Sequence, residues 1–267
     1  MSRVRIVTVQ LCVLVTIVVG GLAQADETFY CDRFISNVPF QITAPGHYCL
    51  ARNIITSIAS GNAITINASS VWLDLNNFTL DGTPAGTATD ASGIVAVGGS
   101  NITVRNGVVK GFFNGINLAG SGGNQTVENV WADRNYVNGI AARGSRGGHV
   151  LRHNVVTNTG GSTNAGQTSA ANASVGIAVT GASTILDNQV TQTSINVVNG
   201  VAAIGFELDF EGDGQVAVGN RVIAAGTVGF ACGDAATSKV FLRDNIVAST
   251  PQAYGPACNA IGTSNFP

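Results

Sequence analysis

Charged residues are scarce in this 267-residue chain. They make up 10% of it, against about 25% in an average globular domain. Only Lys110 and Lys239 are lysines, and the formal net charge is −2. A chain of this kind lacks the basic footprint that binds a nucleic-acid backbone. We therefore expect no nucleic acid among its partners.

Helical patterning and long apolar runs are also absent beyond residue 25. No stretch shows the 3.6-residue spacing of an amphipathic helix, and none is long and apolar enough to span a bilayer. The chain still contains 45% apolar residues and 34 glycines, so it has ample material for a core. Low hydrophobicity with high charge, the usual cause of disorder, does not apply. The sequence predicts a folded protein without a transmembrane segment.

Residues 1–25 have the layout of a secretory signal peptide. Two arginines precede an apolar stretch over residues 6–19, and the small-x-small motif Ala23-Gln24-Ala25 follows. An uncleaved anchor is disfavoured because the apolar stretch is shorter than the roughly 20 residues that a span needs. We expect a mature chain that begins at Asp26 and is secreted, to the periplasm or the extracellular space.

Four cysteines remain in the mature chain, at positions 31, 49, 232 and 258. An even number in an exported chain favours disulfides over a metal site. Three pairings are possible. Because the cysteines cluster at the two ends of the chain, we favour Cys31 with Cys49 and Cys232 with Cys258, each of which closes a local loop.

Two signals recur along the chain and indicate its fold class. One is a glycine followed by an apolar residue, and the other is an asparagine followed two positions later by an apolar residue. The glycine pairs are Gly93-Ile94, Gly115-Ile116, Gly139-Ile140, Gly176-Ile177, Gly200-Val201 and Gly229-Phe230, and the asparagines are Asn106, Asn129, Asn154, Asn188, Asn220 and Asn245. Short β-branched runs between them are typical of strands. A unit of about two dozen residues with three short strands cannot bury its own face, so the pattern predicts a solenoid.

The asparagine column has a physical explanation in a solenoid. Asparagine tolerates left-handed backbone angles where every coil turns, and its amide can bond to the same asparagine one coil away, about 4.8 Å along the axis. Glycine is expected to let the chain enter the next strand after a loop. An antiparallel sandwich, the alternative, would not require the same residue in six successive turns. In this register Trp131 shares the column of Val108 and Val156, so we expect it to be buried.

These coils, together with Pro45-Gly46-His47-Tyr48-Cys49-Leu50 and Val71-Trp72-Leu73-Asp74-Leu75-Asn76-Asn77, resemble the secreted β-helix proteins of the pectin-lyase-like superfamily. The resemblance implies an all-β fold, a single-stranded right-handed parallel β-helix with three sheets around an apolar core. We expect about seven or eight coils with disulfide-closed ends. The expected organisation is a signal peptide over 1–25, an N-terminal cap over 26–60, the helix over 61–247 and a C-terminal cap over 248–267.

The resemblance also implies where to look for a site, namely on the outer face of the first sheet, where enzymes of the superfamily hold polysaccharide. Strand alternation places the residue after each glycine pair on that face. These residues are Val95, Asn117, Ala141, Ala178, Ala202 and Ala231, and none of them can move a proton. The nearest catalytic candidates are Arg143, Arg146 and Asp133. Asn117, Arg143 and Trp72 are the candidates for substrate binding.

Two insertions interrupt the repeat, and one of them is acidic. The first covers 158–174, and the second centres on Glu207 to Gly214. Within the second, Asp209, Glu211 and Asp213 alternate before a glycine, as at the start of a calcium loop. Glu stands at the third position and Asn220 at the twelfth, which departs from that pattern. Calcium binding and a merely solvated acidic loop both remain open.

The sequence leaves three functions open. The first is a glycan-binding or surface protein, associated with polysaccharide, without a demonstrable catalytic set. The second is a polysaccharide lyase, epimerase or glycoside hydrolase that uses the first sheet, with calcium as a possible cofactor. The third is a purely structural envelope protein. The sequence names neither the sugar nor the oligomeric state.

Overall fold

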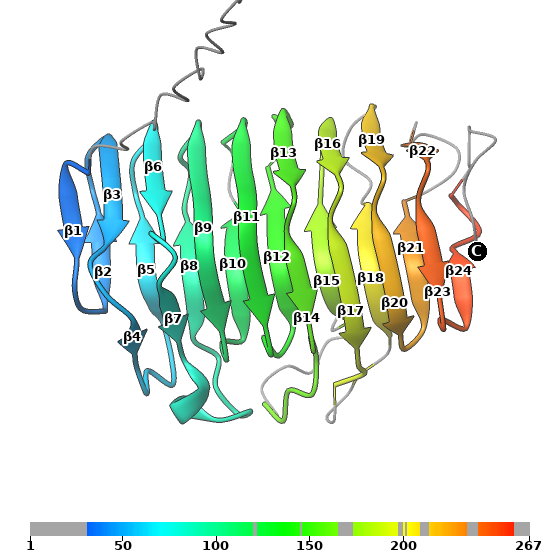
Figure 1. Ribbon diagram of the computed structural model, residues 1–267, viewed down its shortest axis with the longest axis horizontal. Coiled ribbons are helices and arrows are strands. Elements are labelled where there is room, and N and C mark those ends of the chain that lie inside the picture. Colours follow the sequence, from blue (N-terminus) through cyan, green and yellow to red (C-terminus); the bar gives the residue numbers. More distant parts are fainter. Residues whose placement is uncertain are drawn as a thin grey trace, which may run out of the picture. The chain divides into compact units, whose positions relative to one another are not determined.

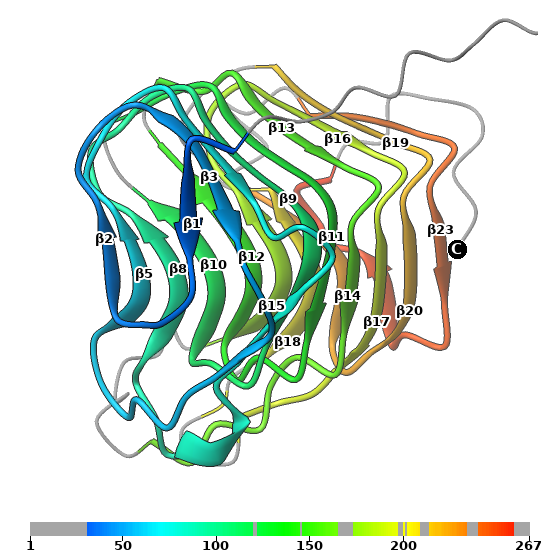
Figure 2. The same ribbon diagram turned by 60° about the vertical axis from the view of Figure 1, so that its left-hand side comes forward.

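The described part of the protein is all-β, and every strand pairing in it is parallel (Figure 1). The computed structural model describes residues 31–119, 122–144, 146–164, 173–196, 200, 202–208, 214–233 and 240–258. The strands form one sheet of nine strands and one of 15. In each repeat the chain passes once through the smaller sheet and then along the larger one, so that neighbouring strands come from successive repeats (Figure 2).

The nine-stranded sheet is built from one short strand per repeat. Its strands are β2 (Phe40–Ile42), β5 (Asn62–Ile66), β8 (Ser92–Ala96), β10 (Asn114–Ala119), β12 (Asn138–Arg143), β15 (Ser174–Val179), β18 (Ala203–Leu208), β21 (Val228–Cys232) and β24 (Gln252–Tyr254). The pairing register aligns Ile64, Ile94, Ile116, Ile140 and Ile177 with Phe206 and Phe230. This column is fully buried, and the rings of Phe206 and Phe230 stack with centroids 4.8 Å apart. Continuous burial of like residues supplies much of the hydrophobic stabilisation.

The 15-stranded sheet has two halves. The first half holds β1 (Arg33–Ile35), β3 (Gly46–Leu50), β6 (Val71–Asp74), β13 (His149–Arg152), β16 (Ser183–Leu186), β19 (Gln215–Val218) and β22 (Val240–Arg243). The second half holds β4 (Ile54–Ile55), β7 (Thr79–Asp81), β14 (Val155–Thr157), β17 (Gln189–Thr193), β20 (Arg221–Ala225) and β23 (Ile246–Ala248). The long strands β9 (Ile102–Lys110) and β11 (Gln125–Asp133) run through both halves. A short 3-10 turn, Thr83–Ala85, follows β7.

The two halves meet at a bend, and the residue at the bend has a positive φ in successive repeats. These residues are Asn106, Asn129, His153, Asp187, Gly219 and Asp244, with φ between 52° and 69°. We call them the bend column. The prediction that the six asparagines form one left-handed column is therefore wrong for the last four, because the residue before each of them takes the left-handed conformation.

The asparagine that follows the bend is buried and forms a ladder in four successive repeats. The Nδ2 atoms of Asn154, Asn188 and Asn220 donate to the Oδ1 atom of the next asparagine at 2.9, 3.0 and 3.1 Å, and Asn245 ends the series. We call these four residues the asparagine ladder. Asn106 and Asn129 lie outside the ladder. Strand β11 pairs Trp131 with Val155, so Val130 is aligned with Asn154, and Asn129 is aligned with His153 and with Asn106 in the bend column.

The glycine column is explained by close packing across the core. A Cβ on Gly229 would lie 2.6 Å from the carbonyl oxygen of Ala253 in the next strand and 2.7 Å from Val247 Cγ1 in β23. A Cβ on Gly205 would lie 2.6 Å from the carbonyl oxygen of Gly229 and 2.7 Å from Val222 Cγ1 in β20. Real Cβ atoms do not approach so closely, so only glycine lets the two sheets meet at this corner. The column serves sheet packing rather than the return from a loop, which corrects the sequence-based explanation.

Both ends of the described chain carry a disulfide. Cys31 bonds to Cys49 and Cys232 to Cys258, which is the pairing that the sequence favoured. Strands β1 to β4 fall within the predicted N-terminal cap. The predicted signal peptide lies outside the described residues. None of the helical segments in the described ranges is long and apolar enough to cross a membrane.

The core is apolar at one end of the larger sheet and polar in its middle. At the inner position where each repeat enters that sheet, Val71 and Ile102 are followed in register by Gln125, His149 and Ser183, all buried. His149 Nδ1 accepts a hydrogen bond from the backbone N–H of Gln125 at 3.3 Å. Burial lowers the pKa of His149, and a contact between its ring and the carbonyl of Gly144 opposes that shift only in part.

Candidate functional site

The outer face of the nine-stranded sheet differs from the prediction at one decisive position. The glycine pair of β18 is Gly205-Phe206, not Gly200-Val201, so the outward residue is Glu207 and not Ala202. The face therefore holds a carboxylate that the sequence-based register missed. Glu207 forms an ion pair with Arg143 at the end of β12, two repeats away.

On the middle repeats of the same face, the residues are buried rather than open to solvent. Ala141, Ala178, Val175 and Ile204 form a second buried apolar cluster there, with exposed fractions between 0% and 8%. Asn117, one repeat before Ala141, is half-buried. General acid–base hydrolysis needs two carboxyl groups facing the sugar, whereas the described outward positions offer only Glu207, already paired with Arg143. This arrangement does not supply a catalytic pair.

An open groove lies instead on the larger sheet, across the bend. It has a volume of about 350 Å³ and spans four successive repeats. It is lined by Asn77, Gly107, Val108, Asn129, Val130, Trp131, His153 and Val155. We call it the Trp131 groove. Its floor combines apolar strand residues with polar side chains of the bend column.

Trp131 is 48% exposed, so the prediction that it is buried is wrong. Strand β11 pairs Trp131 with Val108 on one side and with Val155 on the other. The inward positions of this stretch are Val130 and Ala132, which are buried. The error is the one-residue shift of Asn129, which moves every following side chain to the opposite face.

The Trp131 side chain is held in place by a chain of hydrogen bonds. Its indole Nε1–H donates to Thr157 Oγ1 at 2.8 Å, and Thr157 Oγ1 donates to Asp133 Oδ1 at 2.7 Å. Asp133 also accepts from Asn158 Nδ2 at 2.9 Å and pairs with Arg134 at 2.8 Å. A fixed ring edge leaves Trp131 ordered before any ligand arrives.

The same contacts decide the chemistry of Asp133, one of the catalytic candidates. Burial by itself would raise the pKa of Asp133, but the hydrogen bonds from Asn158, Thr157 and Arg134 outweigh it and lower that pKa. The carboxylate is thus ionised and both its oxygens are engaged. Asp133 acts as an anchor for the Trp131 network rather than as a proton donor.

Trp72, the other tryptophan, lies on the first half of the same sheet and is 40% exposed. His47 of β3 stacks on its ring with centroids 5.3 Å apart, and Arg105 of β9 lies over the ring at 5.5 Å. Because β3 and β9 flank β6 on opposite sides, these two groups approach Trp72 from opposite sides. The ring of Trp72 is thus contacted by His47 and Arg105.

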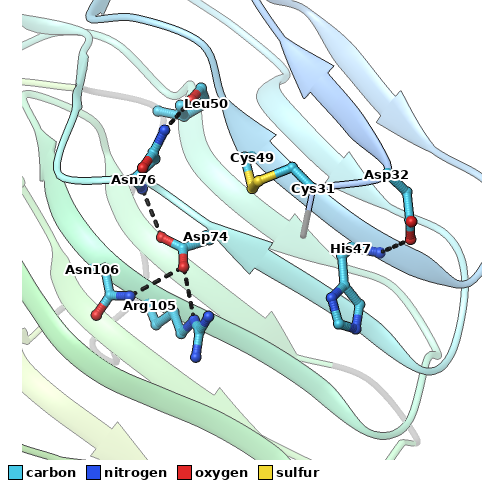
Figure 3. The surroundings of a disulfide bond; sticks show 9 residues. All are labelled: Cys31, Asp32, His47, Cys49, Leu50, Asp74, Asn76, Arg105 and Asn106. Atoms are coloured by element: carbon cyan, nitrogen blue, oxygen red, sulfur yellow. Dashed lines mark hydrogen bonds and ion pairs between the residues drawn. A yellow bond between two sulfur atoms is a disulfide. The ribbon is translucent and has the colours of Figure 1, made fainter. Parts of the chain in front are cut away.

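Arg105 is itself fixed by a polar cluster near the first disulfide (Figure 3). Its Nε lies 2.9 Å from Asp74 Oδ2, and Asp74 also accepts from Asn106 Nδ2 at 3.1 Å and from the backbone N–H of Asn76 at 2.7 Å. Trp72 is thereby part of a self-contained surface cluster. It does not lie with Asn117 and Arg143, the other predicted substrate-binding residues, which belong to the nine-stranded sheet.

The remaining predicted site residues do not form a site within the described part of the chain. Arg146 is exposed in the turn after β12. Asp209, Glu211 and Asp213, the predicted calcium ligands, lie outside the described residues. Within the ranges that are described, no three His, Cys, Asp or Glu side chains are grouped so as to hold a metal ion.

No family model, no curated protein and no solved structure matches the chain. Its function must therefore be argued from its own side chains.

Proposed function

We propose that this protein is an exported right-handed parallel β-helix of about seven or eight coils, of the pectin-lyase-like kind, and that it binds polysaccharide in the Trp131 groove. The uniform parallel pairing, the asparagine ladder and the two disulfides support the fold and the export. The binding function rests on Trp131 itself.

Trp131 supports glycan binding because it combines exposure with order. An aromatic side chain half open to water normally loses the benefit of burial, and a ligand that covers it restores that benefit. Sugars present an apolar C–H face that suits a flat ring and hydroxyl groups that suit nearby amides. Asn77 and Asn129 are exposed at the same groove, and their side-chain amides make no hydrogen bond within the described chain.

Binding without cleavage is the form of the proposal that the described residues favour. The Trp131 groove contains no carboxylate among its lining residues, and its one ionisable side chain is His153. Acid–base cleavage of a glycosidic bond by a carboxyl pair has no donor there. The alternative of an enzyme would place its site on the nine-stranded sheet and the acidic loop, not in the Trp131 groove.

The test is a binding assay with product analysis on residues 26–267. Soluble neutral and uronate-containing polysaccharides are titrated with wild type, Trp131→Ala and Ala248→Ser, an exposed control on the same half-sheet. We expect one polymer class to bind, at least about 30-fold weaker binding by Trp131→Ala, since an aromatic hot spot contributes about 2 kcal/mol or more, and intact polymers by mass spectrometry. Binding that survives in Trp131→Ala, or calcium-dependent unsaturated products, would contradict the proposal.

A further inference from the structure

We infer that the ligand of the Trp131 groove is a neutral, hydroxyl-rich polysaccharide that lies along the stacking direction of the repeats. The inference rests on the proposed function and specifies its substrate class. Three observations carry it: the pairing of charges on both sides of the groove, the chemistry of its polar lining, and its direction across the strands.

Charges border the groove on both sides, and most of them form ion pairs. On the first half of the sheet, Arg105 pairs with Asp74 at 2.9 Å and Arg152 pairs with Glu128 at 2.6 Å. In the register these residues form one row in which negative and positive side chains alternate from repeat to repeat. Opposite charges at contact distance cancel each other's field within a few ångströms in salt solution.

The second half of the sheet repeats the arrangement. Lys110 pairs with Asp81 at 3.0 Å, and Arg134 pairs with Asp133 at 2.8 Å. Four cations and four carboxylates thus frame the groove as ion pairs, and the surplus charge beside them is negative. At its far end Asp187, 3.8 Å from His153, adds a further carboxylate. No lining residue offers an arginine or lysine to a sugar acid, so a uronate or sulfated chain would lose its hydration without gaining an ion pair.

The polar lining instead matches sugar hydroxyls. Asn77 and Asn129 each present a carbonyl acceptor and an amide donor, and His153 presents an imidazole. A hydroxyl group both donates and accepts, so one amide can serve it in both directions. Val108 and Val155 flank Trp131 and extend the apolar surface on which a C–H face can lie.

The direction of the groove follows from which strands line it. Its residues come from the β6–β7 bend, from β9, from β11 and from the β13–β14 bend, which are neighbours in sheet order. Strands in a sheet lie about 4.8 Å apart, so the outermost lining strands are about 14 Å apart. That length fits a short stretch of polymer that crosses the strands, and it exceeds a single sugar.

The test compares oligosaccharides of equal length and different charge. Neutral β-linked gluco-oligosaccharides, from the monosaccharide upward, and oligogalacturonates are titrated by calorimetry at 50 and at 500 mM NaCl. We expect the neutral series to gain affinity with length until it fills the groove, to bind at least about tenfold tighter than the acidic series, and to change less than about twofold with salt.

The outcomes separate the inference from the function beneath it. Tighter binding of oligogalacturonate, weakened by salt and lost in Trp131→Ala, would overturn the inference and keep the proposed function. Absence of binding by any glycan would overturn the function itself. A converse variant sharpens the result: Glu128→Gln frees the Arg152 guanidinium beside the groove, so oligogalacturonate affinity at 50 mM NaCl should rise at least about threefold. No gain in that variant would show that the charge pairs do not set the preference.

Discussion

The two tryptophans of this protein share one sheet and nearly the same exposure, yet their surroundings differ. Trp72 is flanked by His47 and Arg105 from the neighbouring strands, and Arg105 is tied to Asp74. Trp131 is flanked by valines and held at its ring edge by Thr157. Exposure alone therefore does not identify a binding residue. What distinguishes Trp131 is a ring that is oriented by the protein and has no aromatic or cationic partner among the described residues.

The support beneath the two residues differs as well. The asparagine ladder ends next to Trp131, where Asn154 Oδ1 accepts a hydrogen bond from the backbone N–H of Val130 at 3.1 Å. Asn154 Nδ2 also donates to the Val127 carbonyl at 2.8 Å. Buried amide bonds thus fix the strand that carries Trp131. The strand that carries Trp72 is held by its pairing with β3 and β9 and by the buried side chains of Val71 and Leu73.

Breaking the ladder should give the largest effect. We expect Asn154→Ala to lower the free energy of unfolding by about 2–5 kcal/mol, because it orphans the buried N–H of Val130 and the carbonyl of Val127. Denaturant titration measures the change. Asn129→Gly is the matched control, since glycine stands naturally at the same bend position as Gly219, and it should cost less than about 0.5 kcal/mol. Equal costs would show that the ladder does not carry this part of the fold.

Removing the other tryptophan tests whether its role is structural. Trp72→Ala should destabilise the protein by about 1–2 kcal/mol, because the stacking of His47 and the cation–π contact of Arg105 are lost. Thermal unfolding reports the loss, and glycan affinity should stay within twofold of wild type. A large loss of affinity with unchanged stability would reverse the roles assigned to Trp72 and Trp131.

Releasing the ring edge of Trp131 should have a smaller effect. Thr157→Val removes the acceptor of the indole N–H and should weaken glycan binding about fivefold, which corresponds to about 1 kcal/mol for one hydrogen bond. The control is Thr191→Val, at the same position one repeat later. If both variants bind like wild type, the hydrogen bond does not orient the ring for the ligand.

Acidification probes the inner position at which each repeat enters the larger sheet, which is apolar at Val71 and polar at Gln125 and His149. The lowered pKa of His149 means that the unfolded chain binds a proton more readily than the folded one, so stability rises with pH through this titration. The contribution is present above the ordinary histidine pKa of about 6.5 and is lost as the pH falls below it. His149→Gln, which copies Gln125, should flatten the loss of stability between pH 7 and pH 5. A slope equal to that of wild type would assign the acid sensitivity to other groups.

Much of the fold could be predicted from the sequence because the same residue types recur at the same positions of successive repeats. Short β-branched runs, glycine–apolar pairs and asparagines recur along the chain and predicted a solenoid of short strands, and the resemblance to the pectin-lyase-like superfamily implied that the strands are parallel. The disulfide pairing followed from the position of the cysteines at the two chain ends. These features are determined locally, so single stretches of sequence carry the signal.

The candidate site could not be predicted because a one-residue error in strand register changes which side chains face outward. Asn129 looks like a ladder member, but the long strand β11 places it in the bend column and turns Trp131 outward. Gly205-Phe206 would have revealed Glu207 as an outward residue, had Phe206 been aligned with Phe230. Pairing of Arg143 with Glu207 crosses 64 residues and has no local signature. Because successive side chains of a strand point to opposite faces, every one-residue error in register assigns a side chain to the wrong face.

The most direct measurement uses the fact that the chain contains only two tryptophans. Trp72→Phe leaves Trp131 as the sole reporter, and Trp131→Phe leaves Trp72. Each variant is titrated with a neutral gluco-oligosaccharide while its fluorescence and its quenching by acrylamide are followed. We predict that Trp131 emission shifts and becomes shielded in a saturable way, and that Trp72 emission stays unchanged. A saturable response from Trp72 with a silent Trp131 would contradict the account.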